Sequence, residues 1–350
     1  MKQRLARWGS LVAATAIVTA CSEAPEPVAP HQVQNSMSVE AQSHLPQWFD
    51  EASPAVLALP GTVFADNDEA NNRLLFGVEN ANAIPGVRAA LEHLGIPSNA
   101  YAIQVTEPIH QMVSLQDRWR PTLNGVQIHF GNYLCSLGFN ALDGTEASFI
   151  TASHCTNTQG GVEGTKYYQP LSSVDPTVIA TEVEDPPYLK GGKCPRGKKC
   201  RYSDASRARY SSGISSNYAI ASTSGPNNNS LTVTGSWAVG GGDYTTTNFP
   251  IGLQVNKVGR TTGWTQGNVT NTCVNTNVSG SQITQLCQTF VSAPGGAVVV
   301  KGGDSGSGVF TGTNNATIVG ILWGGNGSGT QYVFSPLKQV RDELGPITVK

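Results

Sequence analysis

Residues 302–308 read Gly-Gly-Asp-Ser-Gly-Ser-Gly and place the hydroxyl of Ser305 among glycines, directly after the apolar run at 297–300. Glycine permits a tight bend with positive φ and allows a ligand to approach the backbone closely. The amides of Gly303 and Ser305 can then converge on one oxyanion beside the attacking hydroxyl. In a chain with 39 glycines, such a stretch is also compatible with an ordinary turn. A nucleophile therefore requires a base, and the base requires an orienting group.

A candidate base follows a predicted strand in the run Phe-Ile-Thr-Ala-Ser-His-Cys at 149–155. Beyond residue 121 the chain has two histidines, His129 and His154. A single histidine at a strand end is more often structural than catalytic. His154 differs from such a residue in its neighbour, Cys155, whose disulfide would hold the main chain beside the imidazole in place.

The rest of the chain must position these groups, and its composition favours strands. From about residue 121, glycine, serine, threonine and asparagine are abundant and helix formers are sparse. Short apolar and alternating runs recur, for example at 125–130, 148–152, 253–258, 298–300 and 316–322. They predict an all-β barrel or sandwich, with a helix only at about 336–344. A charged fraction of 13% and a net charge of −2 leave little attraction for nucleic acid.

Residues 48–120 have a different character. Residues 73–78 and 101–105 read as strands, and apolar residues recur with helical spacing over 87–94 before Gly95 and Pro97. We expect a small α+β unit here, a boundary in the polar, turn-rich segment near 120, and a second domain at 121–350. The proline-containing stretch at 22–47 predicts a flexible tether without a fold.

The start of the chain resembles an export signal. A basic segment precedes the apolar run at 11–20, which ends in Val-Thr-Ala-Cys at 18–21. This ending is similar to the bacterial lipoprotein signal, which implies that Cys21 is lipidated and becomes the mature N-terminus. An ordinary secretory signal with an incidental cysteine is the alternative. In either case we expect export, with membrane attachment in the first.

Six further cysteines form three sequential pairs, and locality predicts the disulfides Cys135–Cys155, Cys194–Cys200 and Cys273–Cys287. Six cysteines allow about 15 pairings, so spacing alone leaves the others open. A zinc site is poorly supported, because no Cys-x-x-Cys repeat occurs and the expected compartment is oxidising. We expect no metal and no cofactor.

The motifs at 149–155 and 302–308, taken together, resemble those of chymotrypsin-type serine proteases, in which Thr-Ala-x-His-Cys surrounds the histidine. The resemblance covers roughly 121–340 and implies two packed antiparallel six-stranded β-barrels. It supports the pairing of Cys135 with Cys155. It also implies a catalytic triad, with Asp204 in Arg-Tyr-Ser-Asp-Ala-Ser at 201–206 as the orienting carboxylate. The order His154, Asp204, Ser305 is the order of that family and not that of α/β-hydrolases.

The run Gly-Arg-Thr-Thr-Gly at 259–263 is similar to a signature of the bacterial streptogrisin and α-lytic protease branch. In that branch the arginine pairs with the aspartate before the nucleophile, which implies an ion pair between Arg260 and Asp304. The unit at 48–120 resembles the pro-regions of this branch in position and pattern. The resemblance therefore implies a zymogen whose pro-region assists folding and blocks the site.

The substrate pocket implied by the resemblance is lined by Val299, Trp323, Gly324 and Val333. Val299 stands where trypsin-like members carry an aspartate, so a basic P1 side chain lacks a counter-charge. We expect apolar or medium-sized P1 residues, or acidic ones if Lys301 turns inward. One departure from the family is Leu322, which replaces a serine that would support Asp204.

These patterns together predict an exported, monomeric serine endopeptidase that acts on peptides or proteins through a His154, Asp204 and Ser305 triad, with an oxyanion hole at Gly303 and Ser305. The first alternative is a protease-like binding protein whose site stays covered by the unit at 48–120. The second is a surface adhesin, which would not need His154 or Asp204.

Overall fold

The structure is a computed structural model that describes residues 39–109 and 112–350. The chain divides into two compact units, Met1–His110 and Gln111–Lys350, and each is described by itself. The expected signal at 1–21, its Cys21 and most of the expected tether lie outside the described residues. Within the described ranges, no helix has both the length and the apolar character needed to cross a membrane.

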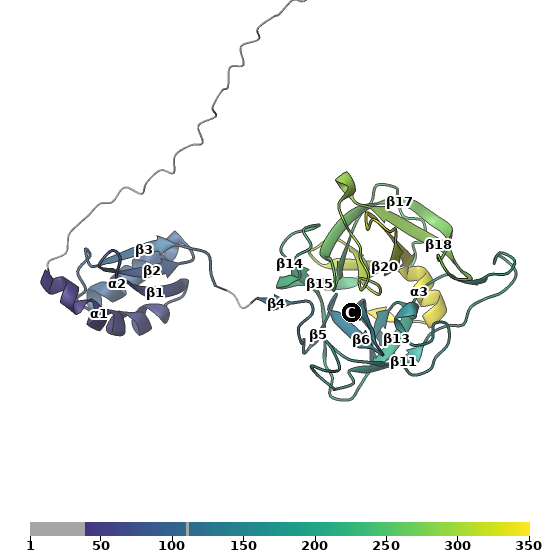
Figure 1. The fold of residues 1–350 in the computed structure, drawn as a ribbon, viewed down its shortest axis with the longest axis horizontal. Helices are drawn as coiled ribbons and strands as arrows, with labels where there is room; N and C mark the ends of the chain where they lie inside the picture. The colour runs from purple at the N-terminus through teal and green to yellow at the C-terminus, as the bar shows by residue number, and fades with distance from the viewer. Residues whose placement is uncertain (1–38, 110–111) are drawn as a thin grey trace, which may run out of the picture. The chain divides into compact units, whose positions relative to one another are not determined.

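The N-terminal unit pairs a three-stranded sheet with two α-helices over residues 39–109 (Figure 1). Its elements are α1 (Val39–Leu57), β1 (Thr62–Asp68), β2 (Arg73–Val78), the 3-10 helix η1 (Ala81–Ala83), α2 (Ile84–His93) and β3 (Tyr101–Val105). The strands lie in the order β1-β2-β3, with β1 antiparallel and β3 parallel to β2. The strands expected at 73–78 and 101–105 are confirmed.

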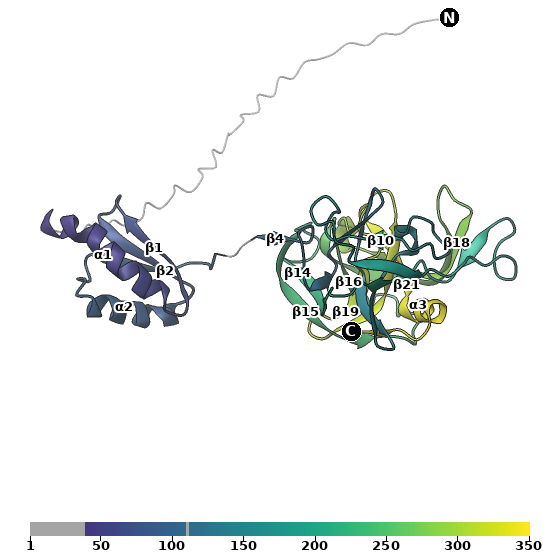
Figure 2. The ribbon, with the colours of Figure 1, turned by 90° about the horizontal axis from the view of Figure 1, so that it is seen from below.

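Helix α1 corrects the expected tether, because residues 39–47 are helical. Pro46 and Pro54 lie inside this helix, and their presence pointed away from a helix in the sequence. Tertiary packing overrides that local preference: the buried side chains of Ala52 and Val56 join Phe76 of β2 in one apolar core. Helices α1 and α2 lie side by side (Figure 2).

The C-terminal unit consists mostly of β-strands. Its elements are β4 (Val113–Ser114), β5 (Thr122–Asn124), β6 (Gln127–Phe130), β7 (Tyr133–Ser136), β8 (Phe139–Asp143), β9 (Glu146–Thr151), η2 (Ser153–Cys155), β10 (Lys166–Tyr167), β11 (Ala180–Glu184), β12 (Lys199–Arg201), β13 (Ser206–Tyr210), β14 (Ser216–Thr223), β15 (Thr232–Gly242), β16 (Gln254–Gly259), β17 (Gly263–Asn277), β18 (Ile283–Ser292), η3 (Pro294–Gly296), β19 (Gly308–Thr311), β20 (Ala316–Gly325), β21 (Gln331–Pro336), α3 (Leu337–Leu344) and β22 (Thr348–Val349).

One expected domain boundary and one expected strand differ from the structure. Residues 112–120 belong to the C-terminal unit, since β4 pairs with β15 and Leu115 is buried in the core of that unit. The strand expected at 298–300 is absent, although Val299 and Val300 are buried. Their apolar run reflects burial without strand pairing, and periodicity alone cannot distinguish such a segment from a buried strand. The expected C-terminal helix is present as α3.

One barrel is a closed ring of six antiparallel strands. Strand β16 pairs with β17, which pairs with β18; β18 pairs with β21, β21 with β20, β20 with β19, and β19 again with β16. Closure removes free sheet edges, and the strand faces turned inward form an apolar core that includes Val255, Val269, Val309 and Phe334. Strands β17, β18 and β20 of this ring are visible in Figure 1.

The other barrel closes through a bent strand and a single bridge. Strands β8, β9, β13, β11 and β10 are successive antiparallel neighbours. Strand β7 runs on into β8 after Leu137 and Gly138, and it pairs with β6. The bridge between His129 of β6 and Tyr168 joins β6 to the end of β10 and completes the ring. The C-terminal unit is therefore an all-β fold of two six-stranded barrels.

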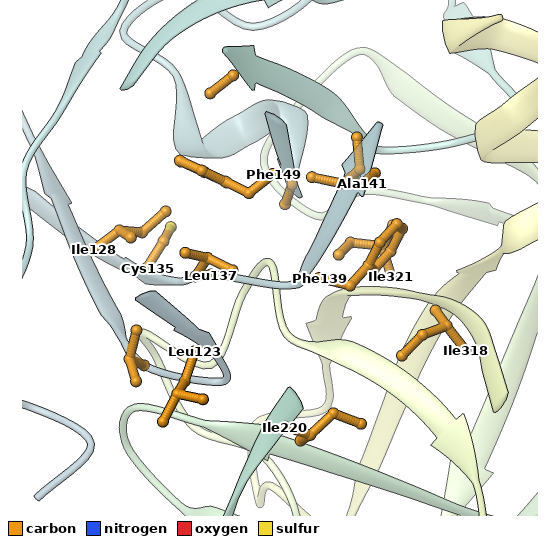
Figure 3. Close-up of a cluster of buried hydrophobic side chains, with 14 of the residues drawn as sticks. Leu123, Ile128, Cys135, Leu137, Phe139, Ala141, Phe149, Ile220, Ile318 and Ile321 are labelled. Carbon is orange, nitrogen blue, oxygen red and sulfur yellow. The ribbon is translucent and has the colours of Figure 1, made fainter. Parts of the chain in front are cut away.

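The largest apolar core contains side chains from both barrels. Figure 3 shows Phe139 of β8 beside Ile321 of β20, and both are fully buried. Each such side chain stabilises the fold by about 1.5–3 kcal/mol. Gly138 is needed at this contact, because a Cβ there would overlap Ile321 and the carbonyl oxygen of Gly306. The barrel that contains β8 thereby lies directly against the Gly-Asp-Ser-Gly stretch.

The six cysteines of this unit pair as locality predicted. The disulfides are Cys135–Cys155, Cys194–Cys200 and Cys273–Cys287. The first joins β7 to η2, the short helix that carries His154. The second closes a loop that ends at β12, and the third joins β17 to β18.

Candidate active site

His154 is held at the end of β9 by its backbone on both sides. Thr151 ends the strand, and η2 turns the chain so that the disulfide of Cys155 follows the histidine immediately. The amide of His154 donates to Asp204 Oδ1 at 3.0 Å. The ring is one-third exposed (33%), so one edge is accessible while the other faces the protein.

Asp204 is the group that orients this ring. Its carboxylate is 2% exposed, and Oδ2 lies 3.1 Å from His154 Nδ1. An ionised carboxylate only accepts hydrogen bonds, so it selects the tautomer with the proton on Nδ1. Nε2 then carries a lone pair on the exposed side of the ring. Gln159 Nε2 also donates to Oδ2, at 3.3 Å.

The charges of the pair shift both pKa values. Burial alone would lower the pKa of His154, but the negative charge of Asp204 and its hydrogen bond outweigh burial, so the pKa lies above 6.5. For Asp204, burial alone would raise the pKa, yet the charge and hydrogen bond of His154 hold it below 3.8. At neutral pH the carboxylate is therefore ionised and favours the protonated form of the ring.

Ser335 supports Asp204 in place of the serine that Leu322 replaces. Its hydroxyl accepts from the amide of Asp204 at 3.0 Å and donates to Gln288 Oε1 at 2.8 Å. Ser335 lies on β21 opposite Ile321 of β20, one position from Leu322. No motif in the sequence marked Ser335, which lies beside the position where the resemblance implied a supporting serine.

A buried ion pair, also missed in the sequence, fixes the backbone on both sides of the His154 and Asp204 pair. Arg201 Nη1 lies 2.6 Å from Asp185 Oδ1 and 2.9 Å from the hydroxyl of Ser153, the residue before His154. Its Nη2 donates to the carbonyl of Ala205, the residue after Asp204, at 2.8 Å. Both charged side chains are fully buried (0% exposed), so water does not solvate either charge and each depends on the other as its partner.

The backbone of Ser305 lies against the strand that carries His154. Its carbonyl accepts from the amide of Ser136 at 2.9 Å. Gly306 has φ of +85°, and a Cβ there would overlap Thr151 Oγ1 and approach the amide of Ala152. Only glycine allows this approach, which places Ser305 next to the histidine segment. Among the described residues, the hydroxyl of Ser305 forms no hydrogen bond with the ring; such catalytic contacts often tighten only when substrate binds.

The amides of Gly303 and Ser305 are available to a ligand. Within the part of the chain that the structure describes, neither donates a hydrogen bond, although the intervening amide of Asp304 donates to Lys301 O at 3.0 Å. Gly303 has φ of +95°, and its carbonyl is held by Ser136 Oγ at 2.9 Å. Two unsatisfied donors separated by one residue, beside a hydroxyl, can bind a developing oxyanion.

The expected ion pair between Arg260 and Asp304 is wrong. The cation nearest Asp304 is Lys257 Nζ, at 3.4 Å from Oδ2, and both side chains are fully buried (0% exposed). Lys257 shares a face of β16 with Val255 and points into the barrel core, whereas Arg260 follows the strand and its Nε donates to Gln127 Oε1 at 2.7 Å. The amides of Thr261 and Thr262 donate to Asp304 Oδ1 at 3.0 and 3.1 Å.

A cleft of about 520 Å³ opens beside this constellation. Its lining includes His154 and the expected pocket residues Trp323, Gly324 and Val333, together with residues 276–279, which are polar and uncharged except for Val278. Val299 does not line it: its side chain is fully buried (0% exposed) in the barrel core, so this pocket assignment is wrong. No lysine or arginine among the described residues lines this cleft.

Comparison with known proteins finds similar solved structures. No family model matches the chain. Similar solved structures include protease A of Thermobifida fusca (24% identity, TM-score 0.45), a Nocardiopsis protease (22%, 0.45) and an α-lytic protease homologue (19%, 0.43). Each alignment covers 65% of this chain and 97%, 98% and 98% of the other, respectively. By name, the first two are proteases and the third is a homologue of one.

Proposed function

We propose that this chain is an exported serine endopeptidase. The observation that supports it most is the buried carboxylate of Asp204, which bonds His154 Nδ1 at 3.1 Å, while Nε2 forms no hydrogen bond among the described residues. A carboxylate, an imidazole and a hydroxyl in this order are the parts that acyl transfer to a serine requires.

In the proposed reaction, Ser305 Oγ attacks the carbonyl carbon of a peptide bond while His154 Nε2 takes its proton. The amides of Gly303 and Ser305 bind the oxyanion of the tetrahedral intermediate. The imidazolium then gives the proton to the departing amine, which leaves an acyl group on Ser305. Water, deprotonated by the same nitrogen, releases the acid and restores the hydroxyl.

Substrate preference follows from the cleft. The aromatic and aliphatic side chains of Trp323 and Val333 line it, and among the described residues Asp204 is its only carboxylate and no lysine or arginine lines it. Burying a charged P1 side chain there without a partner is costly. We therefore propose cleavage after apolar or medium-sized residues.

The N-terminal unit is proposed to be a pro-region that is removed on maturation. It has its own apolar core, formed by residues of α1, β2 and α2 among others. Export follows from the basic and apolar segments at 2–20, and Cys21 is the proposed lipidation site.

The test is digestion of a peptide library by the purified chain, before and after limited proteolysis of the N-terminal unit. We expect cleavage after apolar residues that disappears in Ser305→Ala. Cleavage should persist in Ser212→Ala, a matched change at an exposed turn of the C-terminal unit. Absence of cleavage by both the intact and the trimmed protein would favour a protease-like binding protein.

A further inference from the structure

A strongly basic loop lies outside the proposed active site. Five cations occupy residues 190–199, namely Lys190, Lys193, Arg196, Lys198 and Lys199, in a chain that has 22 basic residues and a net charge of −2. No ion pair involves any of the five among the described residues. The next cation, Arg201, is already neutralised by Asp185. The loop is therefore a local concentration of unneutralised positive charge.

The loop has a fixed, concave shape. The disulfide Cys194–Cys200 closes it, and a bridge between Leu189 and Cys200 ties its two ends together. Lys199 Nζ lies 4.3 Å from the centre of the Tyr188 ring. The loop surrounds a hollow of about 610 Å³, whose lining includes four of the five cations, all but Lys193. Cations held in advance around a hollow bind an anionic ligand with little loss of conformational entropy.

This basic hollow and the proposed active-site cleft flank the same hairpin. Val278 and Ser279, between β17 and β18, line the cleft, and Gln282 of the same turn lines the basic hollow. Strand β12, which ends the loop, pairs in parallel with β18. It also ends at Arg201, three residues before Asp204. A polypeptide bound in the cleft needs to extend only past one hairpin turn to reach the cations.

We propose that the basic loop is an exosite that binds an acidic stretch of the protein substrate while its scissile bond lies in the cleft. This inference rests on the proposed peptidase function. Carboxylates of consecutive Asp or Glu residues match several cations at once, and Arg196 can bind one in a bidentate manner. Because the cleft lining provides no cation of its own, the loop supplies electrostatic selection that the cleft lacks.

The test uses two peptides that share one cleavable sequence and differ in an extension of four glutamates or four glutamines, placed at either end. With the trimmed wild-type protein we expect kcat/KM to be about tenfold higher for the glutamate peptide at low ionic strength, at one of the two ends. The advantage should vanish at about 0.5 M salt, where charges are screened over a few ångströms. The triple variant K190E/K193E/R196E should lose it while cleaving the glutamine peptide normally.

Lys166→Glu is the control, because Lys166 is also exposed and belongs to β10 of the other barrel. It should keep the preference. A preference that survives in the triple variant, or that is absent from the wild type at both ends, would overturn the exosite.

Binding separates this inference from the peptidase itself. Fluorescence anisotropy of the labelled glutamate peptide with Ser305→Ala should show tighter binding than with Ser305→Ala that also carries the three charge reversals. If neither peptide is cleaved by wild type but this difference holds, the peptidase proposal fails and the basic loop stands as a site that binds acidic peptides. Capture by phosphatidylglycerol vesicles that depends on the three cations, without any peptide preference, would instead assign the loop to a membrane surface and overturn the proposal.

Discussion

Asp204→Asn is expected to lower kcat by about 10⁴-fold, the size of the same replacement in chymotrypsin-type proteases. The carboxylate accepts from His154 Nδ1 at 3.1 Å. An asparagine that presents its NH₂ group there would favour the tautomer with the proton on Nε2, which can no longer accept a proton from Ser305. The measurement is steady-state hydrolysis of the best peptide from the library.

The control for this variant is Gln159→Ala, which removes only the 3.3 Å contact to the same carboxylate and should cost less than tenfold. The wild-type pH profile provides a second check. Since His154 must be neutral to act as a base, kcat/KM should rise with pH through a pKa above 6.5. A loss of less than tenfold in Asp204→Asn would contradict the role given to the carboxylate.

Lys257→Met is expected to lower the free energy of unfolding by about 3–5 kcal/mol, because it leaves the carboxylate of Asp304 buried without its cation. Asp304 lies between the two proposed oxyanion donors, so kcat should also fall by about 10²-fold, the size of losing one donor. Urea unfolding and peptide hydrolysis measure the two effects.

A double-mutant cycle separates the ion pair from general core damage. Lys257→Met combined with Asp304→Asn removes both charges and should recover part of the lost stability. Arg260→Gln is the matched comparison, since its Nε bonds Gln127 and no ion pair with Asp304 is present. A greater loss of stability in Arg260→Gln than in Lys257→Met would instead support the ion pair between Arg260 and Asp304 that the sequence predicted.

The sequence located the proposed site because its groups lie in short local motifs. The run at 149–155 places His154 and Cys155 at the end of one strand, and positive φ values favour glycine at two positions of 302–308, Gly303 and Gly306. The disulfides were predictable because each joins cysteines at most 20 residues apart, within or next to paired strands. Alternating runs located β6, β9, β16 and β20, whereas β13, β17, β18 and β19 were not predicted.

Contacts between distant segments were not predictable in the same way. Which of Lys257 and Arg260 reaches Asp304 depends on where β16 ends and which face points inward. Ser335 and Arg201 act through tertiary hydrogen bonds, at separations of 131 residues from Asp204 and 48 from Ser153. Helix α1 forms although it contains two prolines, because burial of its apolar side chains against β2 outweighs the low helix propensity of proline.

The most direct test of the proposed catalytic triad is covalent labelling of the trimmed protein with a fluorophosphonate, followed by peptide mapping. We expect one adduct, on Ser305, that is absent in Ser305→Ala and strongly reduced in His154→Ala. An unlabelled protein, or an adduct on another serine that persists in Ser305→Ala, would contradict the claim that His154, Asp204 and Ser305 act together as one catalytic group.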